Sequence, residues 1–306
     1  MILSSRNAFR KKLVELALHD SSIIDIEADL GGQNNEFQKK IPLRYFNFGI
    51  AESASIDICT GLAKAGFKPV FNTFAPFVAL RTAEHVKLSL AYMNLPIIIA
   101  SCYGGAAGGW FGTTHQSLED LAIIRSMPNI RVGCPYGANE TQELLKYALE
   151  SCNPWYIRLG RNNKYKDEQY LDRFERYTWY NKINRKTKVC LISSGEVATD
   201  FCIEASKFSE NNEFISHLHI IESDTKTIRE LLPIVDSIDI PIIIVEEHRY
   251  FGSIAYMFQA QLSKKNIDYL SVNDKWPIYG GNHYEVLDYL GFSKDKLVNK
   301  INKYLF

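Results

Sequence analysis

Short, compact runs of apolar and β-branched residues recur along the first half of the chain, separated by segments with apolar positions three or four residues apart. Residues 23–27 read Ile-Ile-Asp-Ile-Glu, which is typical of a buried strand. Residues 5–19 place Phe9, Leu13, Leu16 and Ala17 on one face of a helix that Ser5 can cap. The pattern predicts strands at 23–27, 43–48, 69–73, 96–101, 130–134 and 155–159, and helices at 5–19, 53–65, 74–93 and 139–151.

This alternation of strands and helices predicts a parallel sheet that is covered by helices on both faces. On such sheets, ligands bind outside the carboxyl ends of the strands. Residues that could carry chemistry follow the predicted strands directly, and they are Asp29, Glu52, Phe74, Tyr103 and Arg161. We therefore expect one site along this edge of the sheet.

A polar, charged stretch without clean periodicity separates this region from a second alternation of strands and helices. We expect a first domain at 1–165, a linker at 166–186 and a second, smaller α/β domain at 187–306. The predicted fold class is therefore α/β with two doubly wound domains, the first built on a mainly parallel sheet. In the second domain we expect strands at 189–193, 214–221, 241–246 and 268–272. A helix that ends at 209 follows the first of these strands, and further helices are expected at 225–235, 253–264 and 284–304.

The composition narrows the class of protein. The chain has 306 residues, 46% of them hydrophobic, and its 35 basic and 35 acidic side chains cancel. No charge excess points to nucleic acid or to an anionic membrane surface as a partner.

Six dispersed cysteines form no C-x-x-C pair, so neither a zinc site nor a disulfide framework is indicated. A reducing, cytoplasmic location is therefore expected. The N-terminus has no signal-like apolar region, and the most apolar run, at 95–102, is too short to span a bilayer.

Residues 44–54 are the stretch around which the chain is organised, and they read as a strand, a glycine hinge and a helix that opens on a carboxylate. Gly49 permits a sharp exit from the strand. Glu52 lies in the first helical turn, where the helix dipole favours a negative charge. On this stretch alone, Glu52 can equally be an ordinary first-turn acid.

Four further motifs follow in a fixed order. They are Phe74-Ala-Pro-Phe77, Gly112-Thr-Thr-His115-Gln116, Tyr156-Ile-Arg-Leu-Gly-Arg161 and Val245-Glu-Glu-His248. Together with the stretch at 44–54, the series resembles the second half of transketolase and of 1-deoxyxylulose-5-phosphate synthase, over nearly the whole chain from residue 6 to residue 303. The resemblance implies a pyrimidine-binding domain followed by a transketolase C-terminal domain, with thiamine diphosphate as cofactor.

The resemblance also implies which residues meet that cofactor. Its pyrimidine ring must become an imine, and a carboxylic acid hydrogen-bonded to the ring nitrogen promotes this tautomer, a task that only Asp or Glu on a rigid element suits. The family match assigns this catalytic role to Glu52. It places Phe77 on the pyrimidine ring, Phe74 in the pocket wall, Ile50 against the bent cofactor and Asp29 in a nearby loop. Without the resemblance, Phe74 and Phe77 are equally consistent with core packing.

On the substrate side, the resemblance is partial. His115 matches a substrate-contacting histidine with a catalytic role, and Arg6 and Arg161 match arginines that contact a phosphate, a group that a rigid guanidinium suits. Three positions depart from the family pattern: Phe111 stands where the family has an aspartate, Tyr103 where it has a histidine, and Gln33 where it has a small hydroxyl residue. The acceptor pocket is therefore expected to be altered while the cofactor-activating residues are retained.

Three other motifs carry weaker signals. The glycine-dense segment 104–109 lacks the features of a P-loop and of a dinucleotide-binding loop, so we expect its backbone to approach the cofactor or the substrate. His217-Leu-His219 has no third ligand and is not expected to hold a metal, and no metal ligands are predicted in this chain. Glu246-Glu-His248 matches a C-terminal-domain signature, and we assign it no chemistry.

The diphosphate-binding half of the family, with its Gly-Asp-Gly motif and downstream Asn, has no counterpart in these residues. We therefore expect the second subunit of a split transketolase, with Mg²⁺ (or Ca²⁺) held by an N-terminal-half partner, in an α₂β₂ assembly. Its reaction would transfer a two-carbon ketol or acyl unit to a modified sugar or aldehyde acceptor. The alternatives are the β subunit of a 2-oxo acid dehydrogenase, a pyruvate-using transferase related to deoxyxylulose-phosphate synthase, and a catalytically silent assembly or regulatory subunit.

Overall fold

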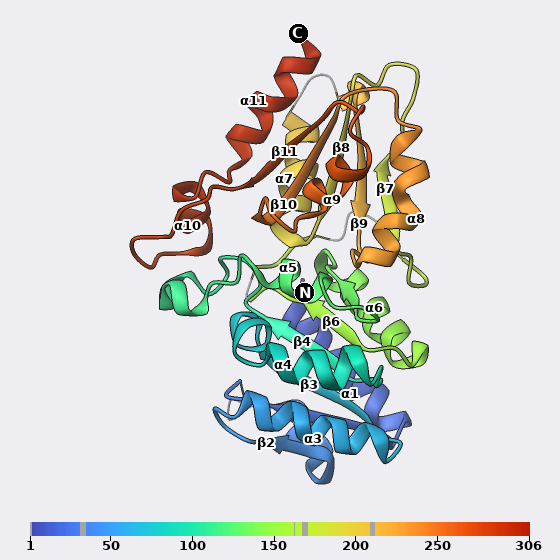
Figure 1. The fold of residues 1–306 in the computed structure, drawn as a ribbon, viewed down its shortest axis with the longest axis vertical. Helices are drawn as coiled ribbons and strands as arrows, with labels where there is room; N and C mark the ends of the chain where they lie inside the picture. The colour runs from blue at the N-terminus through green and yellow to red at the C-terminus, as the bar shows by residue number, and fades with distance from the viewer. Residues whose placement is uncertain (1, 31–34, 162, 167–170, 209–211) are drawn as a thin grey trace.

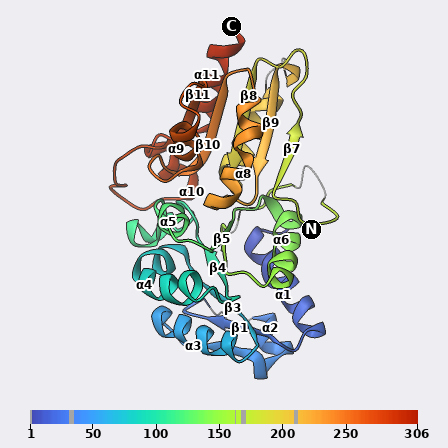
Figure 2. The same cartoon turned by 45° about the vertical axis from the view of Figure 1, so that its right-hand side comes forward.

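The computed structural model describes residues 2–30, 35–161, 163–166, 171–208 and 212–306. Two α/β domains follow one another along the chain, and Figures 1 and 2 show the first below and the second above. Each domain is a sheet between two layers of helices, as the alternating pattern of the sequence predicts. The predicted fold class is confirmed.

The first sheet has six strands in the order β2-β1-β3-β4-β6-β5, and every pairing is parallel. Because all carboxyl ends of a parallel sheet lie at one edge, the segments that follow these strands meet there. The strands are β1 (Ile23–Glu27), β2 (Tyr45–Asn47), β3 (Lys68–Phe74), β4 (Ile98–Cys102), β5 (Arg131–Gly133) and β6 (Trp155–Arg158).

Helices cover both faces of the first sheet. Successive side chains of β1 point to opposite faces, so each face presents apolar residues to its own layer of helices. Ile23 packs with one helical layer, and its neighbour Ile24 packs with the other. The first layer is α1 (Ser5–His19), α2 (Glu36–Lys40) and α6 (Gly137–Ser151), and the second includes α3 (Glu52–Lys64), α4 (Ala83–Val86) and α5 (Asp120–Arg125). Most helix boundaries lie within a few residues of those predicted, although Ser4 rather than Ser5 caps α1.

The sequence predicted one continuous helix at 74–93, and this is wrong. The segment consists of a π-helical turn η2 (Phe77–Arg81), the short α4 and a second π-helical turn η3 (Lys87–Tyr92). Two further corrections are smaller. Residues 43–44 belong to a 3₁₀ turn η1 (Pro42–Arg44) rather than to the strand, and α5 was not predicted.

The second sheet has five strands in the order β11-β10-β8-β9-β7. The strand β7 pairs antiparallel with β9 at the edge of this sheet, although it lies in the segment 166–186 that was predicted to be a linker. The second domain therefore draws on residues before 187. Its strands are β7 (Tyr177–Asn181), β8 (Val189–Ser194), β9 (Ile215–Ile220), β10 (Ile242–Arg249) and β11 (Ile267–Val272).

The helices of the second domain also form two layers. One face of the sheet is covered by α8 (Thr225–Asp236) and α9 (Ile254–Gln261), and the other by α7 (Glu196–Phe208), α10 (His283–Tyr289) and α11 (Lys294–Leu305). The helix expected at 284–304 is thus divided in two. The remaining short 3₁₀ turns are η4 (Gly109–Phe111), η5 (Thr113–His115) and η6 (Asn212–Phe214).

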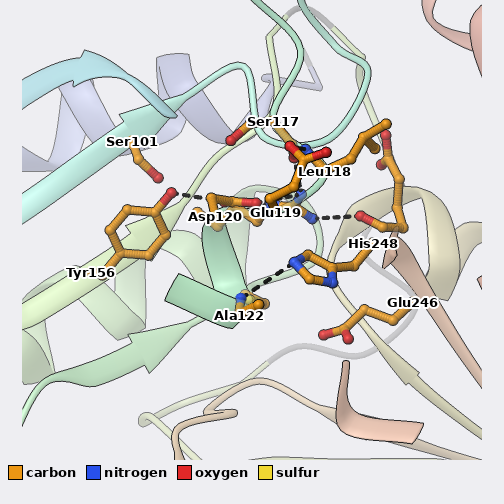
Figure 3. Close-up of polar contacts among 12 residues, drawn as sticks. Ser101, Ser117, Leu118, Glu119, Asp120, Ala122, Tyr156, Glu246 and His248 are labelled. Atoms are coloured by element: carbon orange, nitrogen blue, oxygen red, sulfur yellow. Dashed lines mark hydrogen bonds and ion pairs between the residues drawn. The ribbon is translucent and has the colours of Figure 1, made fainter. Parts of the chain in front are cut away.

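Buried charges join the two domains. Arg158, at the end of β6, donates to both carboxylate oxygens of Asp120 at 3.0 Å and to the backbone oxygen of Glu247 in β10 at 3.1 Å. Figure 3 shows the hydroxyl of Tyr156 donating to the same carboxylate, at 2.7 Å, and His248 meeting the backbone N–H of Ala122. This network fixes the second domain against the edge of the first sheet that carries the predicted site residues.

Candidate active site

The carboxyl ends of β1, β3, β4 and β6 bring the candidate residues into one region. Two of them sit in left-handed backbone conformations immediately after a strand, Asp29 with φ 57° and Tyr103 with φ 62°. Non-glycine residues rarely adopt such angles, and they concentrate at functional sites. The sheet topology therefore confirms that one edge carries these residues, as the sequence predicted.

Glu52 begins α3 and is almost completely buried, with 2% of its surface exposed. Gly49, with φ 67°, makes the sharp exit from β2 that directs the chain into this helix. The two carboxylate oxygens of Glu52 differ in their environment. Arg81 Nη1 donates to Oε2 at 2.8 Å, whereas Oε1 is buried and has no hydrogen-bond partner. A buried acceptor without a partner costs free energy, so Oε1 is a position where a ligand N–H would be stabilised.

Aromatic rings form a continuous wall beside Glu52. Phe74 lies edge-on to Phe77 with ring centroids 5.5 Å apart, and it packs against Tyr103 at 4.8 Å. The ring of His115 lies 5.0 Å from that of Phe77 and 4.7 Å from that of Phe111. Phe74 and Phe77 therefore lie beside the other candidate residues Tyr103 and His115, and their contact with a cofactor stays a prediction. A flat heteroaromatic ligand suits such a wall.

Two arginines flank the far end of this wall. Arg161 Nε donates to the hydroxyl of Tyr103 at 3.0 Å, and its guanidinium lies 5.0 Å from the Tyr103 ring centroid and 5.7 Å from that of Phe111. The guanidinium of Arg6 lies 5.9 Å from the same Tyr103 ring. Arg6 and Arg161 come from opposite ends of the first domain sequence and converge on Tyr103. Two adjacent guanidinium groups are suited to an anionic group such as a phosphate.

His115 is half-buried, and its Nδ1 lies 2.9 Å from the hydroxyl of Thr114. Burial lowers the pKa of His115, Asp29 opposes this shift, and the guanidinium of Arg81 adds to it. The imidazole is therefore neutral at pH 7, when it can both donate and accept a hydrogen bond.

The glycine-dense segment 104–109 packs closely against its neighbours, and its approach to a cofactor or substrate stays a prediction. A side chain at Gly105 would meet the carboxylate of Glu247, one at Gly108 the backbone of His115, and one at Gly109 the backbone of Gly281. Glu247 Oε1 also accepts from the backbone N–H of Ala106 at 2.7 Å. The glycines are thus required by close packing within the loop and against the second domain, which holds the segment that leads to Phe111 and His115.

One expected cofactor residue, Ile50, is not part of the wall, because it is 72% exposed on the surface next to Glu52. Gln33 lies outside the described residues. The sequence missed two residues that the structure places at the site. Arg81 pairs with Glu52, and its only signal was the basic charge near Phe77. Glu196, from the second domain, lies against Gly160, and burial raises its pKa to about 7.

Other expectations concern the rest of the molecule. Within the described ranges, no group of three or more His, Cys, Asp or Glu side chains could hold a metal ion. His217 and His219 bond instead to hydroxyls and to Glu140 in the interface, and burial, with a smaller effect of His219, lowers the pKa of His217 to about 3. A search of the described helices finds none that is long and apolar enough to cross a lipid bilayer.

Comparisons with known proteins agree with this geometry. The transketolase pyrimidine-binding domain matches residues 2–166. One subunit of the apulose-4-phosphate transketolase from Phocaeicola vulgatus is 28% identical over 302 residues, which cover 96% of this chain and 95% of that protein. The 1-deoxy-D-xylulose-5-phosphate synthase of Haemophilus ducreyi is 36% identical over 157 residues, or 51% of this chain and 25% of that enzyme. A solved split-gene transketolase, described as an inactive β4 tetramer, matches with a TM-score of 0.85 and 29% identity over 100% of this chain and 99% of its own.

Proposed function

Because this chain belongs to the transketolase family, whose pyrimidine-binding domain it carries, we propose that it is the second subunit of a split, thiamine-diphosphate-dependent transferase. The reaction is the transfer of a two-carbon ketol or acyl unit to a sugar or aldehyde acceptor. The enzyme acts in the cytoplasm as an α₂β₂ assembly. Similarity to two subunits of split transketolases over nearly the full length of each supports this division of labour.

The observation that carries the proposal is the buried, unpartnered Oε1 of Glu52, a residue whose other oxygen accepts from Arg81, which in turn lies over the ring of Phe77. Glu52 and Phe77 fit the cofactor's pyrimidine ring, which offers a flat face for Phe77 and a ring nitrogen for the carboxylate. When bound, thiamine diphosphate supplies a carbanion that adds to carbonyl groups. Glu52 holds or releases the proton at the pyrimidine nitrogen, and Phe74 closes the pocket behind Phe77. Asp29 and Ile50 border the same cofactor.

The other residues of the wall act on the substrate. The neutral His115 donates a hydrogen bond to, or accepts one from, a substrate hydroxyl or carbonyl. Arg6 and Arg161, which both lie near the ring of Tyr103, bind a phosphate at the far end. Phe111 borders the acceptor side. The wall therefore orders the site from Glu52, through Phe77 and His115, to the two arginines.

The partner is an N-terminal-half subunit that supplies the diphosphate site. A diphosphate needs a cation held by oxygen ligands, Mg²⁺ or Ca²⁺, and no cluster of acids among the described residues could hold one. The exposed apolar side chains of Phe46, Phe48 and Ile50 lie on and just after the edge strand β2, directly before Glu52. Exposed apolar residues on a sheet edge favour a covering partner.

The proposal is tested by calorimetric titration of thiamine diphosphate in the presence of Mg²⁺. We expect the isolated chain to bind weakly or not at all, because it contacts only the pyrimidine end. Addition of a partner that carries the Gly-Asp-Gly motif should restore both binding and turnover. Tight binding and full activity of the isolated chain would contradict the proposed division of labour, and a complex that never binds the cofactor would support a silent assembly role.

The acceptor should differ from a standard pentose phosphate. Phe111 offers an apolar face where a carboxylate would bond a sugar hydroxyl, and an unpaired hydroxyl costs roughly 1–3 kcal/mol. We therefore expect slow conversion of xylulose and ribose phosphates by the complex and a gain of about tenfold or more in the variant Phe111→Asp. Phe111→Leu, which keeps the apolar face, serves as the control. Efficient conversion by the unmodified complex would refute this expectation.

A second candidate is a pyruvate-using transferase related to deoxyxylulose-phosphate synthase. The 36% identity to such an enzyme over the first half of the chain favours it. Pyruvate and ketose phosphates are distinguished as donors by product analysis, since only pyruvate releases carbon dioxide. The β chain of a 2-oxo acid dehydrogenase would instead transfer the acyl unit to a lipoyl group.

A further inference from the structure

Arg81 contacts two residues of the proposed cofactor site. Its Nη1 donates to Glu52 Oε2 at 2.8 Å, and its guanidinium carbon lies 4.4 Å from the ring centroid of Phe77. The π-helical turn η2 contains both Phe77 and Arg81, with the backbone N–H of Thr82 bonded to the Phe77 oxygen. This wide turn packs beside α3, which carries Glu52, and Figures 1 and 2 show α4, the continuation of the segment, alongside that helix.

A pyrimidine ring would make the same two kinds of contact. It would stack on Phe77 and present an N–H group to the Glu52 carboxylate. A guanidinium is also planar, carries N–H donors in its plane and packs on aromatic faces. We propose that, in the unloaded subunit, the guanidinium of Arg81 takes the place of the cofactor's pyrimidine ring, so that Arg81 and the cofactor compete for Glu52 and Phe77. This inference rests on the proposed function, because it takes these two residues to be the pyrimidine contacts.

Glu52 is buried and Arg81 is half-exposed, and this difference explains both why Arg81 stabilises the unloaded subunit and why it can leave Glu52 when the cofactor binds. The Glu52 side chain is 2% exposed, and a buried carboxylate without a counter-ion would destabilise the unloaded subunit. The Arg81 side chain is 48% exposed and can turn into water without breaking other bonds in the described structure. The Arg158 side chain, by contrast, is 6% exposed and is held by four hydrogen bonds, two to the Asp120 carboxylate and two to backbone oxygens.

Competition has a measurable consequence for cofactor affinity. If Arg81 must leave before the cofactor binds, the apparent dissociation constant equals the intrinsic one divided by the fraction of subunits in which Arg81 has left. Removal of the guanidinium by Arg81→Met should therefore lower the dissociation constant for thiamine diphosphate by about tenfold, which corresponds to ~1.4 kcal/mol. If Arg81 instead remains in the loaded site, the same variant should bind the cofactor more weakly.

The experiment is a titration of the complex with its partner subunit, using thiamine diphosphate at a fixed Mg²⁺ concentration. The unmodified complex, Arg81→Met and Arg81→Lys are compared with Lys87→Met, which removes an exposed cation from the same segment without contacting Glu52. We expect tighter binding for Arg81→Met, an intermediate value for Arg81→Lys and no change for Lys87→Met. Thermal unfolding of the chain alone provides a second readout, and Arg81→Met should lower its melting temperature because Glu52 loses its counter-ion.

The outcomes separate this inference from the function on which it rests. If the unmodified complex binds no thiamine diphosphate, the proposed function fails. If that complex binds it, but Arg81→Met leaves the dissociation constant unchanged or raises it, the function stands and the competition is overturned. Unchanged thermal stability of Arg81→Met would likewise overturn the role of Arg81 as the counter-ion of Glu52.

Discussion

We expect the substitution Glu52→Gln to lower the turnover number of the assembled complex by about a hundredfold or more, while the variant chain folds normally. The amide has the shape of the carboxylate but cannot take up or release a proton at the pyrimidine nitrogen. General acid–base catalysis by a positioned group contributes typically about 10²–10⁴-fold to a rate. Steady-state kinetics at saturating cofactor measure the effect on turnover, and circular dichroism confirms the fold.

A matched control lies on α4, which packs beside the helix that carries Glu52. Glu84, in α4, is exposed, and Glu84→Gln makes the same chemical change away from the aromatic wall. It should leave turnover unchanged. Retention of more than about a tenth of the activity by Glu52→Gln, a difference of only ~1.4 kcal/mol in the barrier, would mean that Glu52 is not the activating acid.

The edge of the sheet that carries the site could be predicted because two local signals coincide there. The β-branched runs fix the strands, and chemically active residues such as Asp29 and Tyr103 follow them directly. A parallel sheet then brings these residues together without any knowledge of long-range contacts. The convergence of Arg6 and Arg161 on Tyr103 could not be predicted from local patterns, because it depends on how the start of α1 meets the end of β6. Only the family resemblance indicated it.

Features that depend on contacts between distant segments could not be predicted. The apolar spacing at 74–93 fits a helix, but it does not reveal the π-helical turn that brings Arg81 to Glu52. The glycines of 104–109 were attributed to ligand approach, which stays a prediction, but the sequence did not reveal that side chains at Gly105 and Gly109 would meet Glu247 and the Gly281 backbone of the second domain. The strand β7 is polar and half-exposed, so its sequence resembles a linker until β9 is present as its neighbour.

The second prediction with a large expected effect concerns Arg158, which is 7% exposed where the two domains meet. We expect Arg158→Met to destabilise the protein by roughly 3–5 kcal/mol, because it leaves the buried carboxylate of Asp120 without its counter-ion. The backbone oxygens of Ser117 and Glu247 would also lose donors. Urea unfolding followed by near-ultraviolet circular dichroism measures the change.

Two comparisons decide whether loss of the ion pair between Arg158 and Asp120 causes the destabilisation. Arg173 pairs with Glu175 at the surface, with side chains 84% and 47% exposed, so Arg173→Met should cost no more than about 1 kcal/mol. In the double variant Arg158→Met with Asp120→Asn, the buried charge is gone, and the loss should be smaller than the sum of the two single losses. If the losses are additive, or if Arg158→Met alone costs less than about 1 kcal/mol, the buried ion pair between Arg158 and Asp120 contributes little to stability. In that case the loop with Phe111 and His115 is held mainly by its other contacts, such as those with Glu247 and Gly281.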